Sequence, residues 1–167
     1  MGAEEHKEKA PKSVEFAVIT VSDTRTEEDD LSGRVIMEIM SSYGHRCVGK
    51  VIVRDDLAEI QKALREFMES SSVKAVIING GTGVAARDVT IEAVEEYQEK
   101  ELPGFGELFR ALSYQEIGSA AIMSRAKAFV SERKPVFCLP GSRGAVALAV
   151  DKLIAPELSH LVWEANR

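Results

Sequence analysis

The sequence predicts an α/β fold: a three-layer α/β/α sandwich with a mostly parallel, doubly wound sheet and a short antiparallel hairpin. Three apolar, β-branched runs of strand length, at residues 14–22, 45–53 and 74–79, alternate with amphipathic helical patterns. The first and third runs are almost continuously apolar, which is typical of strands buried on both faces of a parallel sheet. The β-α-β-α-β order therefore favours a doubly wound sheet.

The helices are predicted from apolar residues repeating on one face. Residues 31–43 form the first helix, and Gly44 is placed to end it in a left-handed conformation. Either Asp55 or Asp56 can cap the second helix. With Asp56 as the cap, Glu59 has the spacing of a capping box, which favours Asp56 as the cap and leaves Asp55 free to turn towards the sheet edge. Further helical stretches are expected at residues 90–98, 105–125 and 142–154, with Pro156 starting a terminal turn.

The hairpin is predicted near the end of the chain. Residues 126–130 and 135–139 are strand candidates, and the polar link between them is short enough for an antiparallel pair. All these elements belong to one domain, residues 13–167. Residues 1–12 alternate Glu and Lys with almost nothing apolar, and we expect a flexible N-terminal extension there.

Composition excludes several classes of protein. The 167 residues carry a net charge of −6 with no basic run, so no nucleic-acid partner is expected. No apolar run is long enough to span a bilayer, and no membrane partner is expected. Cys47 and Cys138 lie in apolar runs as buried thiols do, which favours a reducing compartment. We therefore expect a cytoplasmic protein.

The strongest motif is the glycine-rich segment Gly80-Gly81-Thr82-Gly83, which follows the third strand. Glycines let backbone N–H groups approach an oxyanion, a following helix adds a favourable dipole, and Thr82 adds a hydroxyl donor. The spacing matches neither a P-loop nor a dinucleotide-binding fingerprint. The segment thus indicates a phosphate site, and the alternative is a tight strand-to-helix turn without a ligand.

Two aspartates follow different strands. Asp55 comes after the second strand and Asp88 after the third, so both loops open at the same edge of a parallel sheet. Paired carboxylates facing substrate phosphates suit magnesium. The alternatives are structural, because Asp55 could cap the second helix and Asp88 could pair with Arg87 or favour a helix dipole.

Two weaker motifs lie later in the chain. Pro140-Gly141-Ser142 is followed by Arg143 and could add N–H donors and a cationic clamp, or simply start a helix with Ser142 as its cap. Ser124-Arg125 precedes a strand, where the guanidinium could bind phosphate or be a solvated surface group.

The histidines predict no metal site. His6, His45 and His160 have no metal-ligand spacing to one another or to the cysteines, so the sequence does not predict zinc. The single tryptophan, Trp163, is interpreted as a packing or subunit-contact residue.

Taken together, these segments resemble the MoaB/MogA family of molybdenum cofactor biosynthesis proteins, and are closer to MoaB. The resemblance covers nearly the whole chain after the first dozen residues. The matching segments, in family order, are Thr20-Val-Ser-Asp-Thr-Arg25, Asp30-Leu-Ser-Gly33, Gly80-Gly-Thr-Gly83, Arg87-Asp-Val-Thr90, Phe109-Arg-Ala-Leu-Ser113, Glu116-Ile-Gly118, Ser124-Arg125 and Leu139-Pro-Gly-Ser142.

The resemblance implies an enzyme, a molybdopterin adenylyltransferase that uses ATP and Mg²⁺ and assembles as a homotrimer or hexamer. It assigns catalysis and the metal to Asp55 and Asp88, with a one-residue ambiguity between Asp55 and Asp56. Two alternatives remain: a non-catalytic molybdopterin-binding or scaffold protein of the same fold, and a CinA-type domain acting on other nucleotides. The ligand sites that the resemblance implies are Gly80, Gly81, Thr82, Gly83 and Arg87 for nucleotide phosphate, and Ser124, Arg125, Pro140, Gly141 and Ser142 for the pterin.

Overall fold

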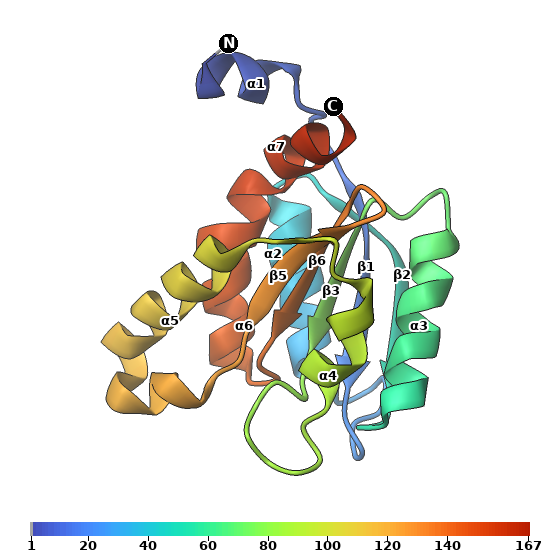
Figure 1. Cartoon of the computed structure of the whole chain (residues 1–167), viewed down its shortest axis with the longest axis vertical. Helices are drawn as coiled ribbons and strands as arrows, with labels where there is room; N and C mark the ends of the chain where they lie inside the picture. The colour runs from blue at the N-terminus through green and yellow to red at the C-terminus, as the bar shows by residue number, and fades with distance from the viewer. Residues whose placement is uncertain (1) are drawn as a thin grey trace.

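The computed structural model describes residues 2–167 and contains one six-stranded sheet with helices on both faces (Figure 1). The strand order is β2-β1-β3-β6-β5-β4; β2, β1, β3 and β6 run parallel, whereas β5 and β4 are antiparallel to their neighbours. The predicted mixed sheet is confirmed. Its strands are β1 (Glu15–Val21), β2 (Arg46–Val53), β3 (Ala75–Asn79), β4 (Lys100–Glu101), β5 (Lys127–Ser131) and β6 (Lys134–Leu139).

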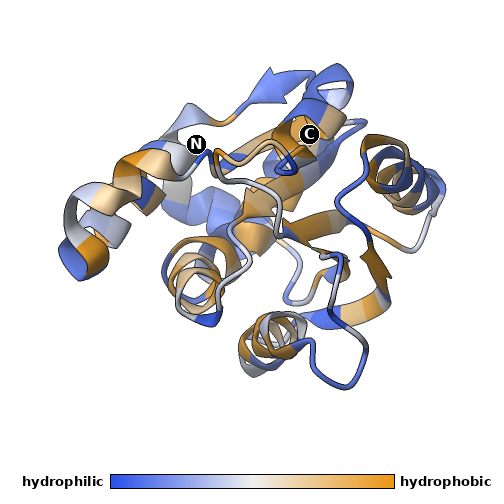
Figure 2. Cartoon of the chain, turned by 90° about the horizontal axis from the view of Figure 1, so that it is seen from below, coloured by the Kyte–Doolittle hydropathy of each residue, from blue (hydrophilic) through white to orange (hydrophobic). Residues whose placement is uncertain are grey.

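The helices form the outer two layers of the sandwich (Figure 2). One layer holds α2, α5, α6 and α7, and the other holds α3 and α4. The helices are α1 (Ala3–Lys9), α2 (Leu31–Ser42), α3 (Leu57–Glu69), α4 (Thr90–Val94), α5 (Pro103–Ile117), α6 (Arg143–Ala149) and α7 (Ala155–Asn166), with short turns η1 (Glu95–Tyr97), η2 (Gly118–Met123) and η3 (Val150–Ile154).

The alternation of side chains along β1 explains the two layers. Phe16 and Val18 pack in the core on the α2, α5–α7 side, whereas Ala17 and Ile19 pack in the core against α3 and α4. All four side chains are fully buried. Burying a side chain such as Ile19 contributes roughly 1.5–3 kcal/mol. The near-continuous apolarity of this strand therefore reflects burial on both faces, as predicted.

The ends of α2 and α3 follow local rules. Gly44 has φ +88° just after α2, which confirms the predicted left-handed end of that helix. Asp56, not Asp55, caps α3 by accepting a hydrogen bond from the Glu59 N–H at 2.9 Å. In a capping box the Glu59 carboxylate would accept a hydrogen bond from the N–H of the cap residue, Asp56. Here it accepts instead from the N–H of Arg54, two residues before the cap, at 3.0 Å.

Two predictions about elements are corrected. Strand β4 was missed, because two charged residues give no apolar alternation. The chain after Pro156 is not a turn but the twelve-residue helix α7, joined to α6 through the π-helical segment η3. Pro156 lies in the first turn of α7, where its missing N–H costs no helical hydrogen bond.

The N-terminal segment contains a helix that the sequence patterns did not predict. The segment predicted to be a flexible extension contains α1, which lies against α7 near the C-terminus (Figure 1). Lys7 forms an ion pair with Glu157 at 2.6 Å, and His6 contacts Glu164. Ion pairs and the packing of His6 on Trp163 hold this helix, so a search for apolar residues in the segment did not predict it.

Both cysteines are free thiols, as predicted. Burial raises the pKa of the Cys138 thiol to about 12, so this group is inert at neutral pH. Among residues 2–167, no helix combines the length and apolarity needed to cross a membrane.

Candidate functional site

A hollow of about 260 Å³ lies at the carboxyl ends of β1, β2 and β3. β1 lies between β2 and β3 in the sheet. The connection from β1 to β2 therefore leads to one side of β1, and the next connection leads to β3 on its other side. Such a switch point is where ligands bind in doubly wound sheets. The lining comes from residues 22–25 after β1, Asp55 after β2, Gly80, Gly81, Arg87 and Asp88 after β3, and Gly141 after β6.

The structure brings Asp55 and Asp88 to this one hollow, as the sequence predicted. Burial raises the pKa of the Asp55 carboxyl, the nearby Asp23 and Asp88 raise it further, and Arg87 opposes them. The Asp23 carboxylate also accepts a hydrogen bond from the Asp55 N–H at 3.0 Å. Negative charge therefore accumulates in the hollow, which suits a cation.

Asp88 has a local role as well. One of its carboxylate oxygens, Oδ2, accepts a hydrogen bond from the Ala85 N–H at 2.9 Å and closes a turn of the glycine loop. The same oxygen would lie 2.8 Å from a Cβ atom on Gly83. Asp88 thus helps shape the loop, and it does so with only one of its two oxygens.

The first two glycines are required by close approach of the backbone. Gly80 has φ +100°, and a Cβ there would lie 2.2 Å from the Val21 carbonyl oxygen on β1. Gly81 has φ +69°, and its Cβ would lie 2.3 Å from the Thr90 hydroxyl, which donates to the Gly80 carbonyl at 2.8 Å. The tight turn is therefore a property of this segment, whichever ligand it binds.

The glycine loop lacks the helix directly after it from which the sequence predicted a favourable dipole. The loop does not run directly into a helix: α4 begins only at Thr90, seven residues after Gly83, and is five residues long (Figure 1). A helix dipole therefore adds little at the glycines, and any anion would depend on backbone N–H groups and on Arg87.

Arg125 stabilises the glycine loop by donating hydrogen bonds to its backbone carbonyls. Its Nε donates to the Gly83 carbonyl at 2.9 Å, and its backbone N–H donates to the Thr82 carbonyl at 3.1 Å. The guanidinium also pairs with Glu92. Thr82 is buried, 2% exposed, and neither it nor Gly83 lines the hollow that holds Asp55.

Ser124 and Arg125 line a second hollow, of about 410 Å³, between α5 and β5. The Arg110 side chain also lines it and donates to the Ala126 carbonyl at 2.8 Å. The bond from Arg125 to the Gly83 carbonyl links this second hollow to the glycine loop. Arg125 also donates to the Asp88 backbone carbonyl at 3.1 Å. The predicted pterin residues Ser124 and Arg125 therefore line a different hollow from the two aspartates, while Arg125 contacts the loop that carries Asp88.

The turn at residues 140–142 has both of its predicted roles: one residue lines a hollow and another caps a helix. Gly141 lines the first hollow, and its carbonyl accepts from the Arg25 guanidinium at 2.8 Å and from the Ser32 hydroxyl at 2.6 Å. Ser142 caps α6 by accepting from the Ala145 N–H at 3.3 Å, which confirms its structural alternative. Pro140 joins β6 to this turn and does not line the first hollow.

Sequence reasoning gave no role to Asp23 and Arg25, although both line the hollow. They follow β1 at the same sheet edge as Asp55, so the rule that located Asp55 would have located them too.

Asp30 is a buried carboxylate whose hydrogen bonds stabilise this edge of the sheet. Its buried carboxylate accepts from the Thr20 hydroxyl at 2.7 Å and from the Gly33 N–H at 3.0 Å, and pairs with Lys50 at 2.9 Å. Burial alone would raise its pKa, but these hydrogen bonds outweigh burial and lower it. The network joins β1, α2 and β2, and holds Ser32 against Gly141.

The fold and the site together define an α/β protein with an acidic hollow at the switch point of its sheet. A family model described as "probable molybdopterin binding domain" matches residues 17–160, and the chain belongs to this family.

Several relatives match over nearly their full length. The molybdenum cofactor biosynthesis protein B of Bacillus subtilis (strain 168) is 51% identical, covering 100% of this chain and 99% of its own. A crystal structure of a molybdenum cofactor biosynthesis protein B is 50% identical, with a TM-score of 0.91 over 95% of this chain and 99% of that chain. The tungsten cofactor synthesizing protein MoaB from Pyrococcus furiosus is 40% identical, with a TM-score of 0.85 over 95% of this chain and 100% of that chain. The family resemblance seen in the sequence is confirmed.

Proposed function

We propose that this chain acts in molybdenum cofactor biosynthesis as an ATP-dependent molybdopterin adenylyltransferase. The observation that carries the proposal is the convergence of Asp55 and Asp88 beside the glycine loop, in a hollow linked through Arg125 to a second hollow. Relatives at about 50% identity carry the name molybdenum cofactor biosynthesis protein B, which supports the pathway. The two free thiols agree with a cytoplasmic site of action.

The two hollows suggest where each substrate binds. Nucleotide phosphates would lie against Gly80 and Gly81 with Arg87 as the cation, because this hollow combines backbone N–H groups with a guanidinium. The pterin would lie in the second hollow beside Ser124 and Arg125. Gly141 lines the first hollow and belongs to the predicted pterin turn, so that turn would border both substrates.

The residues of the first hollow fit a magnesium ion. Asp55 and Asp88 supply hard oxygen ligands. Burial raises the pKa of the Asp55 carboxyl, and the neighbouring Asp23 and Asp88 raise it further, so a cation in the hollow would stabilise the ionised carboxylate. Asp55 and the free oxygen of Asp88 would hold the ion. When bound, it would neutralise charge on the reacting phosphates.

The reaction requires mainly that the protein hold the two substrates in the correct relative position. An oxygen of the molybdopterin phosphate attacks the α-phosphorus of ATP, the bond from that phosphorus to the bridging oxygen breaks, and pyrophosphate leaves with the electron pair. The chain contributes by binding the two substrates in adjoining hollows and by placing Arg87 and the loop N–H groups against the phosphates. Such transfer needs little covalent work from the protein.

A non-catalytic molybdopterin-binding or scaffold protein is the second candidate. One observation favours it: the Asp88 carboxylate already accepts a hydrogen bond from the Ala85 N–H at 2.9 Å and shapes the glycine loop, a role that needs no metal ion. A protein that only binds the pterin would not need the two aspartates as free ligands.

The test is an assay of purified protein with molybdopterin, ATP and Mg²⁺, following adenylylated product and pyrophosphate. We expect product from the wild type, loss of turnover in Asp88→Asn with pterin affinity retained, and normal turnover in the charge-matched control Glu38→Gln on the exposed face of α2. Pterin binding without any product identifies the scaffold alternative. Absence of both binding and product refutes both candidates.

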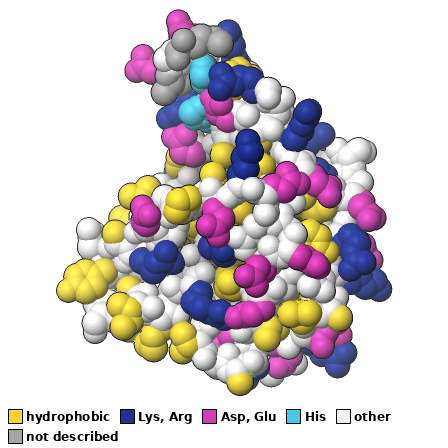
Figure 3. Space-filling view, in the orientation of Figure 1, with side chains coloured by type: hydrophobic (Ala, Val, Ile, Leu, Met, Phe, Trp, Pro, Cys, Tyr) yellow, Lys and Arg dark blue, Asp and Glu magenta, His cyan; other side chains and the backbone are white. Residues whose placement is uncertain are grey.

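We also propose a homotrimer, with a hexamer of two trimers as its larger form. Large apolar side chains are exposed along α5 and η2, where Figure 3 shows hydrophobic atoms gathered. Leu108, Tyr114, Ile117 and Ile122 are each more than half exposed, and a second copy would cover them. Trp163, which the sequence allowed as a subunit-contact residue, packs instead on His6 of the same chain. Light scattering that reports a monomer at micromolar concentration would refute the oligomer.

A further inference from the structure

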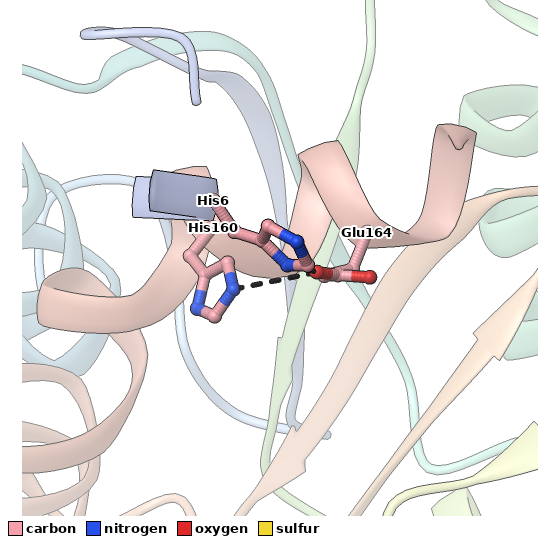
Figure 4. A group of neighbouring side chains, drawn as sticks. All are labelled: His6, His160 and Glu164. Atoms are coloured by element: carbon pink, nitrogen blue, oxygen red, sulfur yellow. Dashed lines mark hydrogen bonds and ion pairs between the residues drawn. The ribbon is translucent and has the colours of Figure 1, made fainter. Parts of the chain in front are cut away.

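Three side chains from opposite ends of the chain meet between α1 and α7, away from both hollows (Figure 4). His6 comes from α1, and His160 and Glu164 come from adjacent turns of α7. One nitrogen of each imidazole and one carboxylate oxygen of Glu164 all lie within 4.8 Å of one another. Figure 3 shows histidine side chains at this end of the molecule.

Neighbouring groups orient the two donors on α7. Arg167 pairs with Oε2 of Glu164 at 3.2 Å, which leaves Oε1 facing His6 Nδ1 at 2.5 Å and His160 Nε2 at 3.6 Å. Glu157 lies 3.2 Å from His160 Nδ1. In the tautomer whose Nδ1–H donates a hydrogen bond to Glu157, the lone pair of the His160 ring is on Nε2. This nitrogen lies on the Glu164 side.

The His6 ring is held by packing. It lies 4.8 Å from the Trp163 ring, centroid to centroid, and its side chain is only 13% exposed. Its Nε2 is buried and has no hydrogen-bond partner among residues 2–167. The other nitrogen of this ring, Nδ1, is hydrogen-bonded to Glu164 Oε1 at 2.5 Å, so these two atoms share one proton. A cation that displaced this proton would meet three electron-pair donors, which are His6 Nδ1, Glu164 Oε1 and His160 Nε2. A cation would satisfy such a set.

We propose that His6, His160 and Glu164 bind a divalent transition-metal ion such as Zn²⁺. Two imidazoles and one carboxylate are a ligand set that zinc accepts, with the fourth position open to water. The set differs from that of the first hollow, whose ligands are oxygens alone and suit magnesium. The bound ion joins α1 to α7 and thereby fastens the N-terminal helix to the domain.

Titration of the full chain with Zn²⁺, and with Co²⁺ as a spectroscopic probe, tests the site directly. Trp163 is the only tryptophan and lies against His6, so its fluorescence reports on binding. We expect one equivalent per chain, with tetrahedral Co²⁺ absorption and quenching of Trp163. Loss of an orienting partner typically weakens a metal site about 10–100-fold. Glu157→Gln should fall in that range, and His160→Ala and Glu164→Gln should each lose at least about 100-fold.

Two control variants separate binding at this cluster from a general charge effect and from binding in the first hollow. Glu8→Gln removes the same charge from exposed α1 without removing a ligand, and should leave the affinity unchanged. The double variant Asp55→Asn/Asp88→Asn should retain the Zn²⁺ equivalent, because those aspartates lie in the first hollow. Loss of the equivalent in the double variant, or its survival in His160→Ala, overturns the proposal.

Limited trypsin digestion gives a readout that does not depend on spectroscopy. Cleavage after Lys7, Lys9 and Lys12 should slow when Zn²⁺ is added, since a fastened α1 is a poorer protease substrate. The His160→Ala variant, which circular dichroism should show to be folded, should gain no protection. Equal Zn²⁺ protection of the wild type and of His160→Ala contradicts the proposal, and so does a wild type that binds no Zn²⁺ at micromolar concentration.

Discussion

The hollow at the sheet edge and the corner between α1 and α7 gather polar side chains in different ways. The residues of the hollow follow parallel strands, so the sheet itself brings Asp23, Asp55 and Asp88 to one edge. The corner joins residues from the two ends of the chain, with His6 and Glu164 separated by 158 positions. A site built on a sheet tolerates little change in its backbone, whereas a corner built on docked helices depends on a few side-chain contacts.

The largest effect should follow from breaking the backbone of the hollow. Gly80→Ala places a Cβ 2.2 Å from the Val21 carbonyl at φ +100°, and we expect a loss of about 3 kcal/mol or more in unfolding free energy. Gly144→Ala is the matched control, because a Cβ there meets nothing within 4 Å. Urea denaturation of both variants measures the difference. Equal stabilities would mean that the close approach of β1 and the loop does not constrain Gly80.

The next effect separates two neighbouring aspartates at the hollow's rim. Asp55→Ala should lower turnover at least about 100-fold, the size typical of losing one charge-stabilising group, with little change in stability. Asp56→Ala should instead cost about 1 kcal/mol of stability through the lost cap of α3 and keep most activity. Melting temperature and magnesium-dependent turnover on both variants decide the assignment. An inactive Asp56→Ala with a normal Asp55→Ala would shift the predicted metal ligand by one residue.

A smaller effect on stability is expected from Asp30, the buried carboxylate that stabilises the sheet edge at the first hollow. The pKa of Asp30 is lower in the folded chain than in the unfolded chain, because hydrogen bonds from Lys50 and Thr20 outweigh the effect of burial. Its stabilising contribution is therefore present above the unfolded pKa of about 4 and is lost as pH falls through the lower folded pKa. Asp30→Asn should cost about 2 kcal/mol at pH 7 and flatten the fall of melting temperature in acid. An unchanged acid slope in the variant would assign that slope to other carboxyl groups.

The smallest effect is expected at the corner. Lys7→Ala removes an ion pair with Glu157 whose two side chains are about half exposed, and such pairs contribute about 0.2–1 kcal/mol. We expect a change in unfolding free energy of about 0.5 kcal/mol or less. Chemical denaturation compares the variant with wild type. A loss larger than that of Asp56→Ala would show that α1 is as integral to the fold as the sheet edge.

The sequence by itself predicted the layers, the mixed sheet and the meeting of Asp55 and Asp88 at one edge. These features depend on patterns within short segments: continuous apolar runs make buried strands, and parallel strands end on the same side. Gly44 and the glycine loop were recognisable for the same reason, since a positive φ is a local demand. For Asp55 and Asp56, the spacing of Asp56 to Glu59 predicted Asp56 as the cap of α3, which is confirmed, and Asp55 as the metal ligand, which stays a prediction.

Only the tertiary structure decided what depends on contact between distant segments. Arg125 was committed to the glycine loop through the approach of β5 to that loop. The meeting of His6 with His160 follows from the docking of α1 on α7, which no spacing in the sequence encodes. Sequence spacing shows which residues share a helix face or a sheet edge. Which faces then meet is determined by the packing of the whole chain.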